Sequence, residues 1–221
     1  MMSGMRRVFV DRRSPQRDAI EEAAKWIANG GVVAIPTDTL YGLAADPFSA
    51  AAIARVFDVK GRSAERALPL IAADAEQVAA HIGRLSPDAA RLAARFWPGP
   101  LTLLVAAPRT LAKDVSGGTG KVGVRVPADD VARRICAAVG RPITATSANV
   151  SGEAATADPA EVERTLGDRI DLLIDTGPTP GAAPSTIVDA TGTAPVLVRA
   201  GAVAWDEILA WLSNEQGARR P

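Results

Sequence analysis

The chain has 221 residues, of which 48% are hydrophobic and only 4% are aromatic, and its 25 Lys and Arg residues balance its 25 Asp and Glu residues. This length favours one domain with a largely aliphatic core. The formal net charge of zero argues against a broad nucleic-acid-coating surface, although it leaves room for a local cationic pocket. We find no apolar run of signal-peptide or membrane-spanning length, so we expect a cytoplasmic protein without membrane contact.

The first half of the chain is expected to alternate strands with helices. Val8-Phe9-Val10 predicts a strand, and Ser14-Pro15 predicts the start of a helix that Gly30 ends. The further elements expected here are a buried strand at 32–35, a helix capped by Ser49, a buried strand at 68–72, a helix from Asp74 to Ile82, a helix opened by Ser86-Pro87, and a strand at 101–106.

The second half continues this alternation after a long loop at 107–120. The elements expected are a strand at 121–126, a helix capped by Asp129 or Asp130, a strand at 142–146, a helix from Asp158 to about Leu166, a strand at 172–175, a hairpin of 185–189 and 195–199, and a helix at about 205–212 before a frayed tail. No linker or repeat divides the chain. We therefore predict one mixed α/β domain over residues 1–221.

A polar cluster directly follows the buried strand at 32–35. It places three hydroxyls and a carboxylate within five residues, at Thr37, Asp38, Thr39 and Tyr41. The next helix is expected to carry Lys60 and Arg62 into a loop. In open α/β sheets such a place commonly binds a ligand. The alternative is that the cluster caps turns, while the cations are solvated at a helix C-terminus.

Two later segments repeat this pattern. The strand at 121–126 alternates, so that Lys121 and Arg125 flank Gly123 on one face and leave room for an anion. The alternative is an edge strand with a solvated face. The strand at 142–146 runs into a polar segment, Ser147 to Gly152, whose alternative is an ordinary Ser/Asn turn.

Several kinds of catalytic site are excluded. The one cysteine, Cys136, allows no internal disulfide and fits a buried, inert thiol on a helix, and the one histidine, His81, allows no histidine-rich metal cage. The glycine pattern from Gly118 to Gly123 matches a dinucleotide-binding motif in letters but leads into a strand rather than a helix. Neither metal-ligand spacing nor a nucleophile elbow is found, so we expect no protein-bound metal.

Five short motifs occur in one order and register over roughly residues 15–203. They are Pro36-Thr-Asp-Thr-Leu-Tyr-Gly42, Lys60-Gly-Arg62, Ser147-Ala-Asn149, Pro184-Ser-Thr-Ile-Val-Asp189 and Val198-Arg-Ala-Gly201. Together they resemble the YrdC family of threonylcarbamoyl-AMP synthases. The resemblance implies a twisted mixed α/β sheet, flanked by helices, around a cationic cavity.

The resemblance also implies an activity and its partners. L-threonine, bicarbonate or CO2, and ATP with Mg²⁺ would give threonylcarbamoyl-AMP and pyrophosphate, which makes the protein a nucleotidyltransferase. The product would serve modification of tRNA to threonylcarbamoyladenosine, completed by separate tRNA threonylcarbamoyl transferase proteins, with weak contact to tRNA as a further expectation. The chain would be a short form without the extra C-terminal domain of longer members.

The resemblance also implies which residues form the site, because the family's site residues can be matched to positions in this sequence. Those matching the threonine site are Thr39, Arg125 and Ser185. Those matching the nucleotide side are Lys60, Arg62, Arg66, Lys121, Ser147, Asn149, Ala155 and Arg199. Lys60 and Arg62 would be catalytic. Because charges lining a wet cavity contribute little to a core, alanine at either position is expected to abolish turnover with little loss of folding.

One departure keeps other functions open. Ile71 stands where many family members have histidine, which removes a polar contact near threonine. A paralogue with a different acyl substrate is therefore one alternative. A noncatalytic RNA-binding or ribosome-assembly module is another, although neutral charge and a single tyrosine weaken it, because such binding needs several phosphate contacts and usually stacking aromatics.

Overall fold

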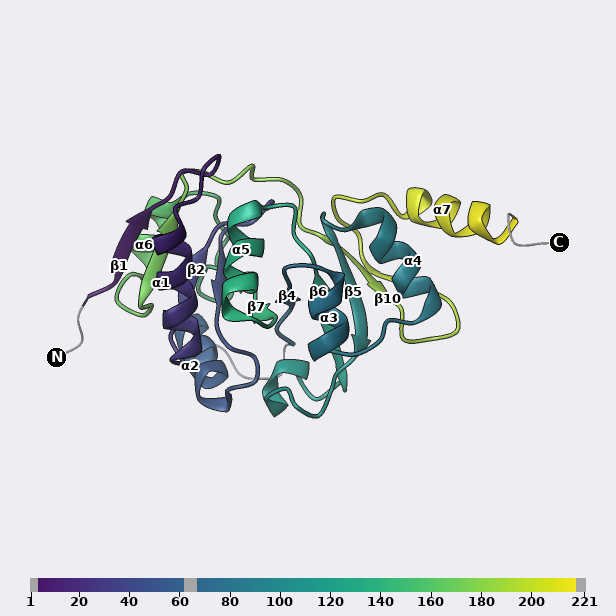
Figure 1. Ribbon diagram of the computed structural model, residues 1–221, viewed down its shortest axis with the longest axis horizontal. Coiled ribbons are helices and arrows are strands. Elements are labelled where there is room, and N and C mark those ends of the chain that lie inside the picture. Colours follow the sequence, from purple (N-terminus) through teal and green to yellow (C-terminus); the bar gives the residue numbers. More distant parts are fainter. Residues whose placement is uncertain (1–3, 62–66, 218–221) are drawn as a thin grey trace.

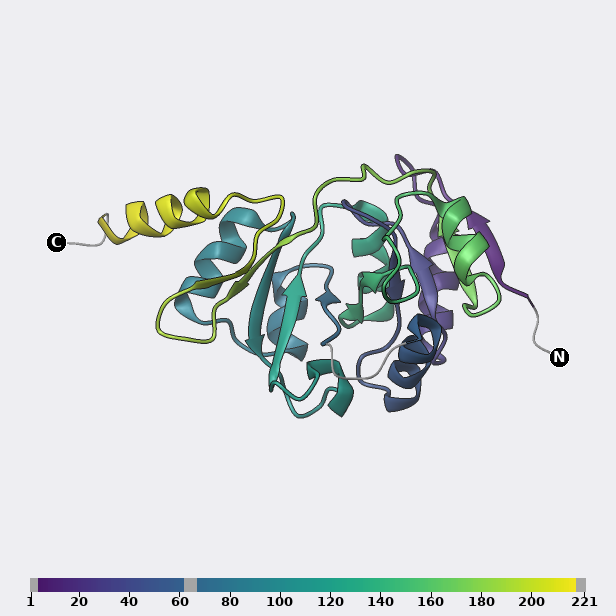
Figure 2. The ribbon, with the colours of Figure 1, turned by 180° about the vertical axis from the view of Figure 1, so that it is seen from behind.

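The computed structural model describes residues 4–61 and 67–217 and confirms a mixed α/β architecture. Its strands form two sheets, one of five strands and one of six. In Figure 1 the five-stranded sheet lies on the left and the six-stranded sheet on the right, with β1 and α7 at opposite sides. From behind, the segment between β9 and β10 crosses from one half to the other (Figure 2).

The five-stranded sheet has the order β1-β9-β2-β3-β8. Its strands are β1 (Arg6–Phe9), β2 (Val33–Ile35), β3 (Gly42–Ala44), β8 (Thr146–Ser147) and β9 (Leu172–Asp175). β1 and β2 both run parallel to β9, whereas β3 is antiparallel to β2 and to β8. β2 and β9 are buried on both faces, which explains their continuous apolar sequences.

The six-stranded sheet has the order β11-β10-β5-β6-β4-β7. Its strands are β4 (Leu70–Ile71), β5 (Leu101–Ala106), β6 (Lys121–Arg125), β7 (Ile143–Thr144), β10 (Thr186–Asp189) and β11 (Val196–Arg199). β10 and β11 form the predicted antiparallel hairpin. β6 lies between β5 and β4, so the alternative of a solvated edge strand is wrong.

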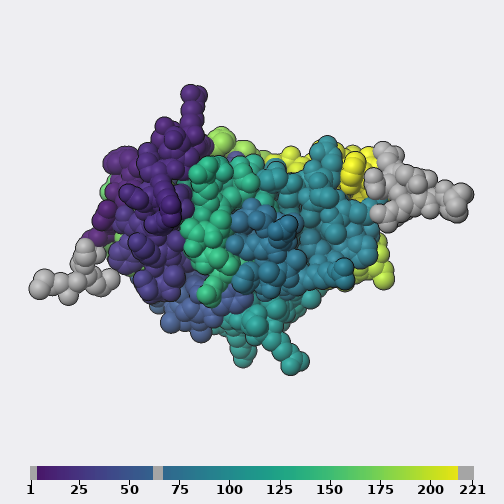
Figure 3. Space-filling model, in the orientation of Figure 1, coloured from purple at the N-terminus to yellow at the C-terminus, as the bar shows by residue number. Residues whose placement is uncertain are grey.

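Seven α-helices and one 3₁₀ turn are found in the described part of the chain. They are α1 (Arg17–Ala28), α2 (Ala50–Lys60), α3 (Ala75–His81), α4 (Pro87–Phe96), η1 (Lys113–Ser116), α5 (Asp130–Val139), α6 (Pro159–Leu166) and α7 (Trp205–Gly217). Figure 3 shows one face of the molecule, on which α5 lies between α1 and α3. α7 packs beside α4.

The core is aliphatic, as the composition predicts. Buried apolar side chains form three clusters, one under α2, one between α1 and α5, and one under α4 and α7. Cys136 is buried in the second cluster, and burial raises the pKa of its thiol far above the usual range. The prediction of a buried thiol at this position is therefore confirmed.

Local signals located most helix starts correctly. Ser49, Asp74, Ser86 and Asp158 each accept a hydrogen bond from a backbone N–H in the first turn of their helix, and of the two candidates for α5 the cap is Asp129. The start of α1 was predicted wrongly at Ser14-Pro15. The helix begins after Gln16, whose side chain makes no capping bond.

The strand and tail predictions need four corrections. The first strand is Arg6–Phe9 rather than 8–10, and β3 was not predicted. The strand expected at 142–146 is two short strands in different sheets, because the chain passes from β7 to β8 through Ala145. The helix α7 continues to Gly217 where a frayed tail was expected.

The backbone at Gly201, after β11, packs tightly against the backbone at the start of β10. A Cβ there would lie 2.5 Å from both the Ser185 carbonyl carbon and the Thr186 nitrogen. Backbone cannot give way as a flexible side chain does, so Gly201→Ala should lower the free energy of unfolding by about 2 kcal/mol or more. Gly192→Ala is the matched control, since its new Cβ would meet no atom nearer than 3.7 Å. Urea denaturation of both variants measures the difference, and equal stabilities would contradict this packing.

Candidate functional site

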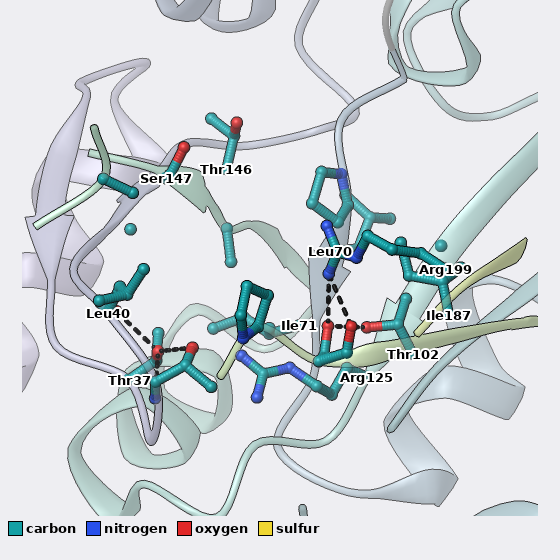
Figure 4. A pocket seen from close by; sticks show the side chains of 18 of the residues that line it. Thr37, Leu40, Leu70, Ile71, Thr102, Arg125, Thr146, Ser147, Ile187 and Arg199 are labelled. Carbon is teal, nitrogen blue, oxygen red and sulfur yellow. Dashed lines mark hydrogen bonds between the residues drawn. The ribbon is translucent and has the colours of Figure 1, made fainter. Parts of the chain in front are cut away.

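A cavity of about 460 Å³ lies between the two sheets and is lined by residues of both. From the side of the five-stranded sheet it is lined by Thr37, Thr39, Leu40, Tyr41, Gly42, Thr146 and Ser147. From the side of the six-stranded sheet it is lined by Leu70, Ile71, Thr102, Leu104, Gly123, Arg125, Ser185, Ile187 and Arg199. Figure 4 shows Thr37 and Leu40 on one side of this space and Arg199 on the other, with the Arg125 side chain extending toward Thr37. Its volume suits a small-molecule ligand.

The three residues predicted to hold threonine, Thr39, Arg125 and Ser185, all line this cavity. Arg125 ends β6 and is only 7% exposed. Its Nη1 donates to Asp38 Oδ1 at 2.7 Å, in a pair that joins the two sheets. A buried guanidinium needs such a partner, because an unpaired charge away from water is strongly unfavourable.

The turn at 37–40 is organised by the hydroxyl of Thr37. That hydroxyl accepts from the Thr39 N–H at 3.1 Å and donates to the Leu40 carbonyl at 2.7 Å. The Thr37 and Thr39 hydroxyl oxygens lie 3.0 Å apart. These short bonds hold Thr37 and Thr39 toward the cavity. The polar cluster therefore caps a turn and lines a cavity at once, so the two interpretations of it are not exclusive.

On the opposite wall, Ser185 is held between Thr102 and Arg199. The hydroxyl oxygens of Ser185 and Thr102 are 2.8 Å apart, and Arg199 Nη2 donates to the Ser185 carbonyl at 2.7 Å. Burial lowers the pKa of Arg199, and the positive charge of Arg125 lowers it further. Two cations facing one small space favour an anionic ligand.

Lys60 is the clearest departure from expectation. It is the last residue of α2, only 2% exposed, and it does not line the cavity. Its Nζ donates to the carbonyls of Ser147 at 2.6 Å and Asn149 at 3.0 Å, and lies 3.3 Å from Asn149 Oδ1. The expectation that this charge lines a wet cavity is therefore wrong. The buried ammonium holds the segment after β8 in place.

The other residues predicted for the nucleotide side divide into three groups. Ser147, Ala155 and Arg199 line the cavity. Lys121 and Asn149 do not: Lys121 Nζ pairs with Asp189 Oδ2 at 2.6 Å, and the Asn149 amide donates to the Val150 and Glu153 carbonyls. Arg62 and Arg66 lie outside the described residues.

Lys121 and Arg125 therefore do not act as one pair of cations. Of these two cations, Arg125 lines the cavity, together with Gly123, and Lys121 does not. Although burial alone would raise the pKa of the Asp189 carboxyl, hydrogen bonds from Lys121 and Thr191 bring it below its usual range. The charge of Lys121 is therefore paired with a carboxylate of the same sheet.

Sequence reasoning gave no role to three residues that shape this site. Asp38 and Tyr41 belonged to the polar cluster but had no assigned partner, and Thr102 was not singled out. Thr102 carries a usable signal, because it is a hydroxyl within the otherwise apolar strand Leu101–Ala106 and is 4% exposed. Asp38 could not be matched to Arg125 because they are 87 residues apart.

The segment from Gly177 to Pro184 lies against the turn at 37–40 and is hydrogen-bonded to it. The Tyr41 hydroxyl donates to the Gly177 carbonyl at 2.8 Å. The Thr39 carbonyl accepts from Thr179 Oγ1 at 2.9 Å and from the Gly181 N–H at 3.1 Å. The segment is therefore tied to one wall of the cavity before it delivers Ser185 to the other.

Two features are absent from the part of the chain that the structure describes. No three His, Cys, Asp or Glu side chains there are placed to hold a metal ion. No helix there is long and apolar enough to cross a membrane.

Comparison with known proteins places this site in context. The Sua5/YciO/YrdC family model, described as "Telomere recombination", matches residues 25–201. A threonylcarbamoyl-AMP synthase of Pyrococcus abyssi is 38% identical over 197 residues, which are 87% of this chain and 58% of that protein. A threonylcarbamoyl-AMP synthase of Halorhodospira halophila is 40% identical over 155 residues, which are 70% of this chain and 81% of that protein.

Among solved structures, the crystal structure of P. abyssi Sua5 complexed with L-threonine is similar over 93% of this chain and 60% of that chain. The TM-score is 0.88 at 35% sequence identity. The chain thus spans somewhat less than two thirds of the P. abyssi protein.

The buried position of Lys60 leads to a prediction about stability. Lys60→Ala would leave the Ser147 and Asn149 carbonyls without this donor and open a cavity, so the free energy of unfolding should fall by about 3 kcal/mol. Lys25→Ala is the matched control, because Lys25 also lies in the last turn of a helix but is exposed, and it should change stability by less than about 0.5 kcal/mol. Chemical denaturation measures both values. An unchanged Lys60→Ala midpoint would show that this ammonium is not structural.

Proposed function

This chain belongs to the Sua5/YciO/YrdC family, and from that premise we propose that it is a threonylcarbamoyl-AMP synthase. The observation that carries the proposal is the convergence of Thr39, Arg125 and Ser185 on one cavity. These are the residues that match the family's threonine site, and a 35% identical relative has been crystallised with L-threonine. They come from three separate segments of the chain, so their meeting is not a consequence of sequence proximity.

At the threonine end, Arg125 grips the carboxylate of the amino acid. A guanidinium presents several N–H donors in a planar fork that matches a carboxylate. Thr39 and Ser185 offer hydroxyls from opposite walls, and Thr102 holds the Ser185 hydroxyl at 2.8 Å. Isoleucine at position 71 gives this end an apolar surface, suited to the methyl group of threonine.

At the nucleotide end, Arg199 and Ser147 face the phosphates of ATP, and Ala155 leaves room beside them. Lys60 donates to the Ser147 and Asn149 oxygens, and to reach a phosphate it would exchange one of these acceptors for a phosphate oxygen. Arg62, Arg66 and Lys121 are proposed as further phosphate contacts from the sequence match alone. Mg²⁺ would enter with ATP as part of the substrate.

The reaction needs positioning and charge neutralisation rather than a protein nucleophile. The threonine amine adds to the carbon of CO2 or of bicarbonate and gives a carbamate, with loss of a proton or of water respectively. A carbamate oxygen then attacks the α-phosphorus of ATP, and pyrophosphate leaves. The cations serve to assemble these anionic reactants and to stabilise the departing pyrophosphate, and Lys60 and Arg62 are proposed as the catalytic pair.

The product, threonylcarbamoyl-AMP, is a reactive mixed anhydride that a second protein must consume. We propose tRNA threonylcarbamoyl transferase proteins as these partners and the cytoplasm as the location. A noncatalytic RNA-binding role is weaker, because the cationic groups Arg125 and Arg199 lie in a cavity rather than along an open surface.

Pyrophosphate release tests the proposal. The assay supplies ATP and Mg²⁺, omits threonine and bicarbonate in turn, and substitutes serine for threonine. Release should require both small substrates, and serine should support less of it, because one methyl group in an apolar site is worth about tenfold or more. Intact ATP binding without release under any condition would favour a paralogue with another acyl substrate. Absent ATP binding would contradict the proposed nucleotide site.

Arg125→Lys separates the two ends of the cavity. Lysine keeps the charge but replaces a planar fork with a point charge, so the KM for threonine should rise about tenfold while the KM for ATP changes little. Steady-state pyrophosphate release, with each substrate varied in turn, gives both constants. Equal losses for both substrates would contradict a carboxylate-binding role for Arg125.

A further inference from the structure

Asp38 is a charged residue of this region that no part of the proposed reaction uses. Its side chain is 14% exposed, it does not line the cavity, and its Oδ1 accepts from Arg125 Nη1 at 2.7 Å. Its chain neighbours Thr37 and Thr39 do line the cavity. Asp38 therefore contacts Arg125 without lining the cavity itself, whereas the residues on either side of it, Thr37 and Thr39, do line it.

Arg125 has donors to spare after this contact. In the described part of the chain, the bond to Asp38 is its one side-chain hydrogen bond or ion pair. A guanidinium has five N–H donors, and Arg125 lines the cavity. The bond at Nη1 thus restrains the plane of the guanidinium while leaving other N–H groups for a ligand.

The support for Asp38 is itself rigid. The Thr37 hydroxyl closes the turn with bonds of 2.7 and 3.1 Å, and the Thr39 carbonyl accepts two donors from the 177–184 segment. A carboxylate on so constrained a turn has little freedom to follow the long arginine side chain. The side chain must instead adapt to the carboxylate.

We propose that Asp38 is a positioning residue for substrate, which aims the Arg125 guanidinium so that its free edge meets the amino-acid carboxylate in two parallel hydrogen bonds. The inference deepens the proposed function and rests on it. Arg199 makes such aiming necessary, because its charge acts on the same space and would repel a loosely held Arg125. Holding a binding group in its productive orientation before the ligand arrives reduces the entropy lost on binding.

Two substitutions distinguish the orientation of the Arg125 guanidinium from the negative charge of Asp38 as the cause of any change in threonine binding. Asp38→Asn keeps a carbonyl that can accept from Arg125 Nη1, whereas Asp38→Ala removes the acceptor. Because a hydrogen bond to a charged group is worth more than about tenfold, the Kd for threonine should rise about tenfold or more in Asp38→Ala. It should rise by only about threefold in Asp38→Asn, where a weaker acceptor remains. Calorimetric titration of threonine, with and without ATP, measures these values.

Asp46→Ala is the matched control. Asp46 is similarly buried, with a side chain 13% exposed, and pairs with Arg141 at 3.4 Å, but neither residue lines the cavity. The threonine Kd of this variant should equal that of the wild type. Partial unfolding would lower the number of binding sites and kcat rather than raise Kd and KM, so KM for threonine and for ATP are measured alongside. Asp38→Ala should raise the KM for threonine and leave the KM for ATP and kcat within about threefold of wild type.

The outcomes are distinct. Threonine binding by the wild type, with an unchanged Kd in Asp38→Ala, would overturn the inference and leave the proposed function standing. Equal losses in Asp38→Asn and Asp38→Ala would also overturn it, by assigning the effect to charge. A folded wild-type protein that binds no threonine with ATP present would overturn the proposed function and this inference with it.

Discussion

The buried pair of Arg125 and Asp38 is the interaction on which the site depends, because it joins the two sheets at the cavity between them. Either charge alone would be strongly unfavourable at this depth. Paired, they allow a cation to stand in the wall of a largely apolar enclosure. One bond therefore joins the two sheets and also holds the guanidinium that we propose binds the threonine carboxylate.

Lys60 is a second buried charge that is stabilised by contacts with a distant part of the chain. Its ammonium is placed where a core would normally exclude charge, and the Ser147 and Asn149 oxygens make that placement tolerable. Those two residues belong to a motif that resembles a phosphate-binding sequence. Under the proposed function, the residues that would contact a nucleotide also keep one another in place, so we expect substitutions at these positions to lower activity and stability together.

The sequence was most informative where a local rule applied. Helix caps at Ser49, Asp74 and Ser86 follow from side chains that satisfy their own backbone, and no distant residue is needed to recognise them. Long-range relations could not be predicted this way. The partner of Asp38 is 87 residues away, and the burial of Lys60 depends on carbonyls contributed 87 and 89 residues later. Residue types predicted a cationic cavity, whereas the hydrogen-bond partners of its side chains could be identified only in the folded structure.

The passage of the chain from β7 to β8 has a consequence for how the two sheets can move relative to each other. Ala145 alone separates a strand of one sheet from a strand of the other, and the Ala145 N–H also donates to the Pro69 carbonyl at 2.9 Å. So short a connection, beside the cavity, ties the two sheets together at one point. Any relative movement of the two sheets that changes the size of the cavity must therefore bend the chain at Ala145 and act on its bond to Pro69.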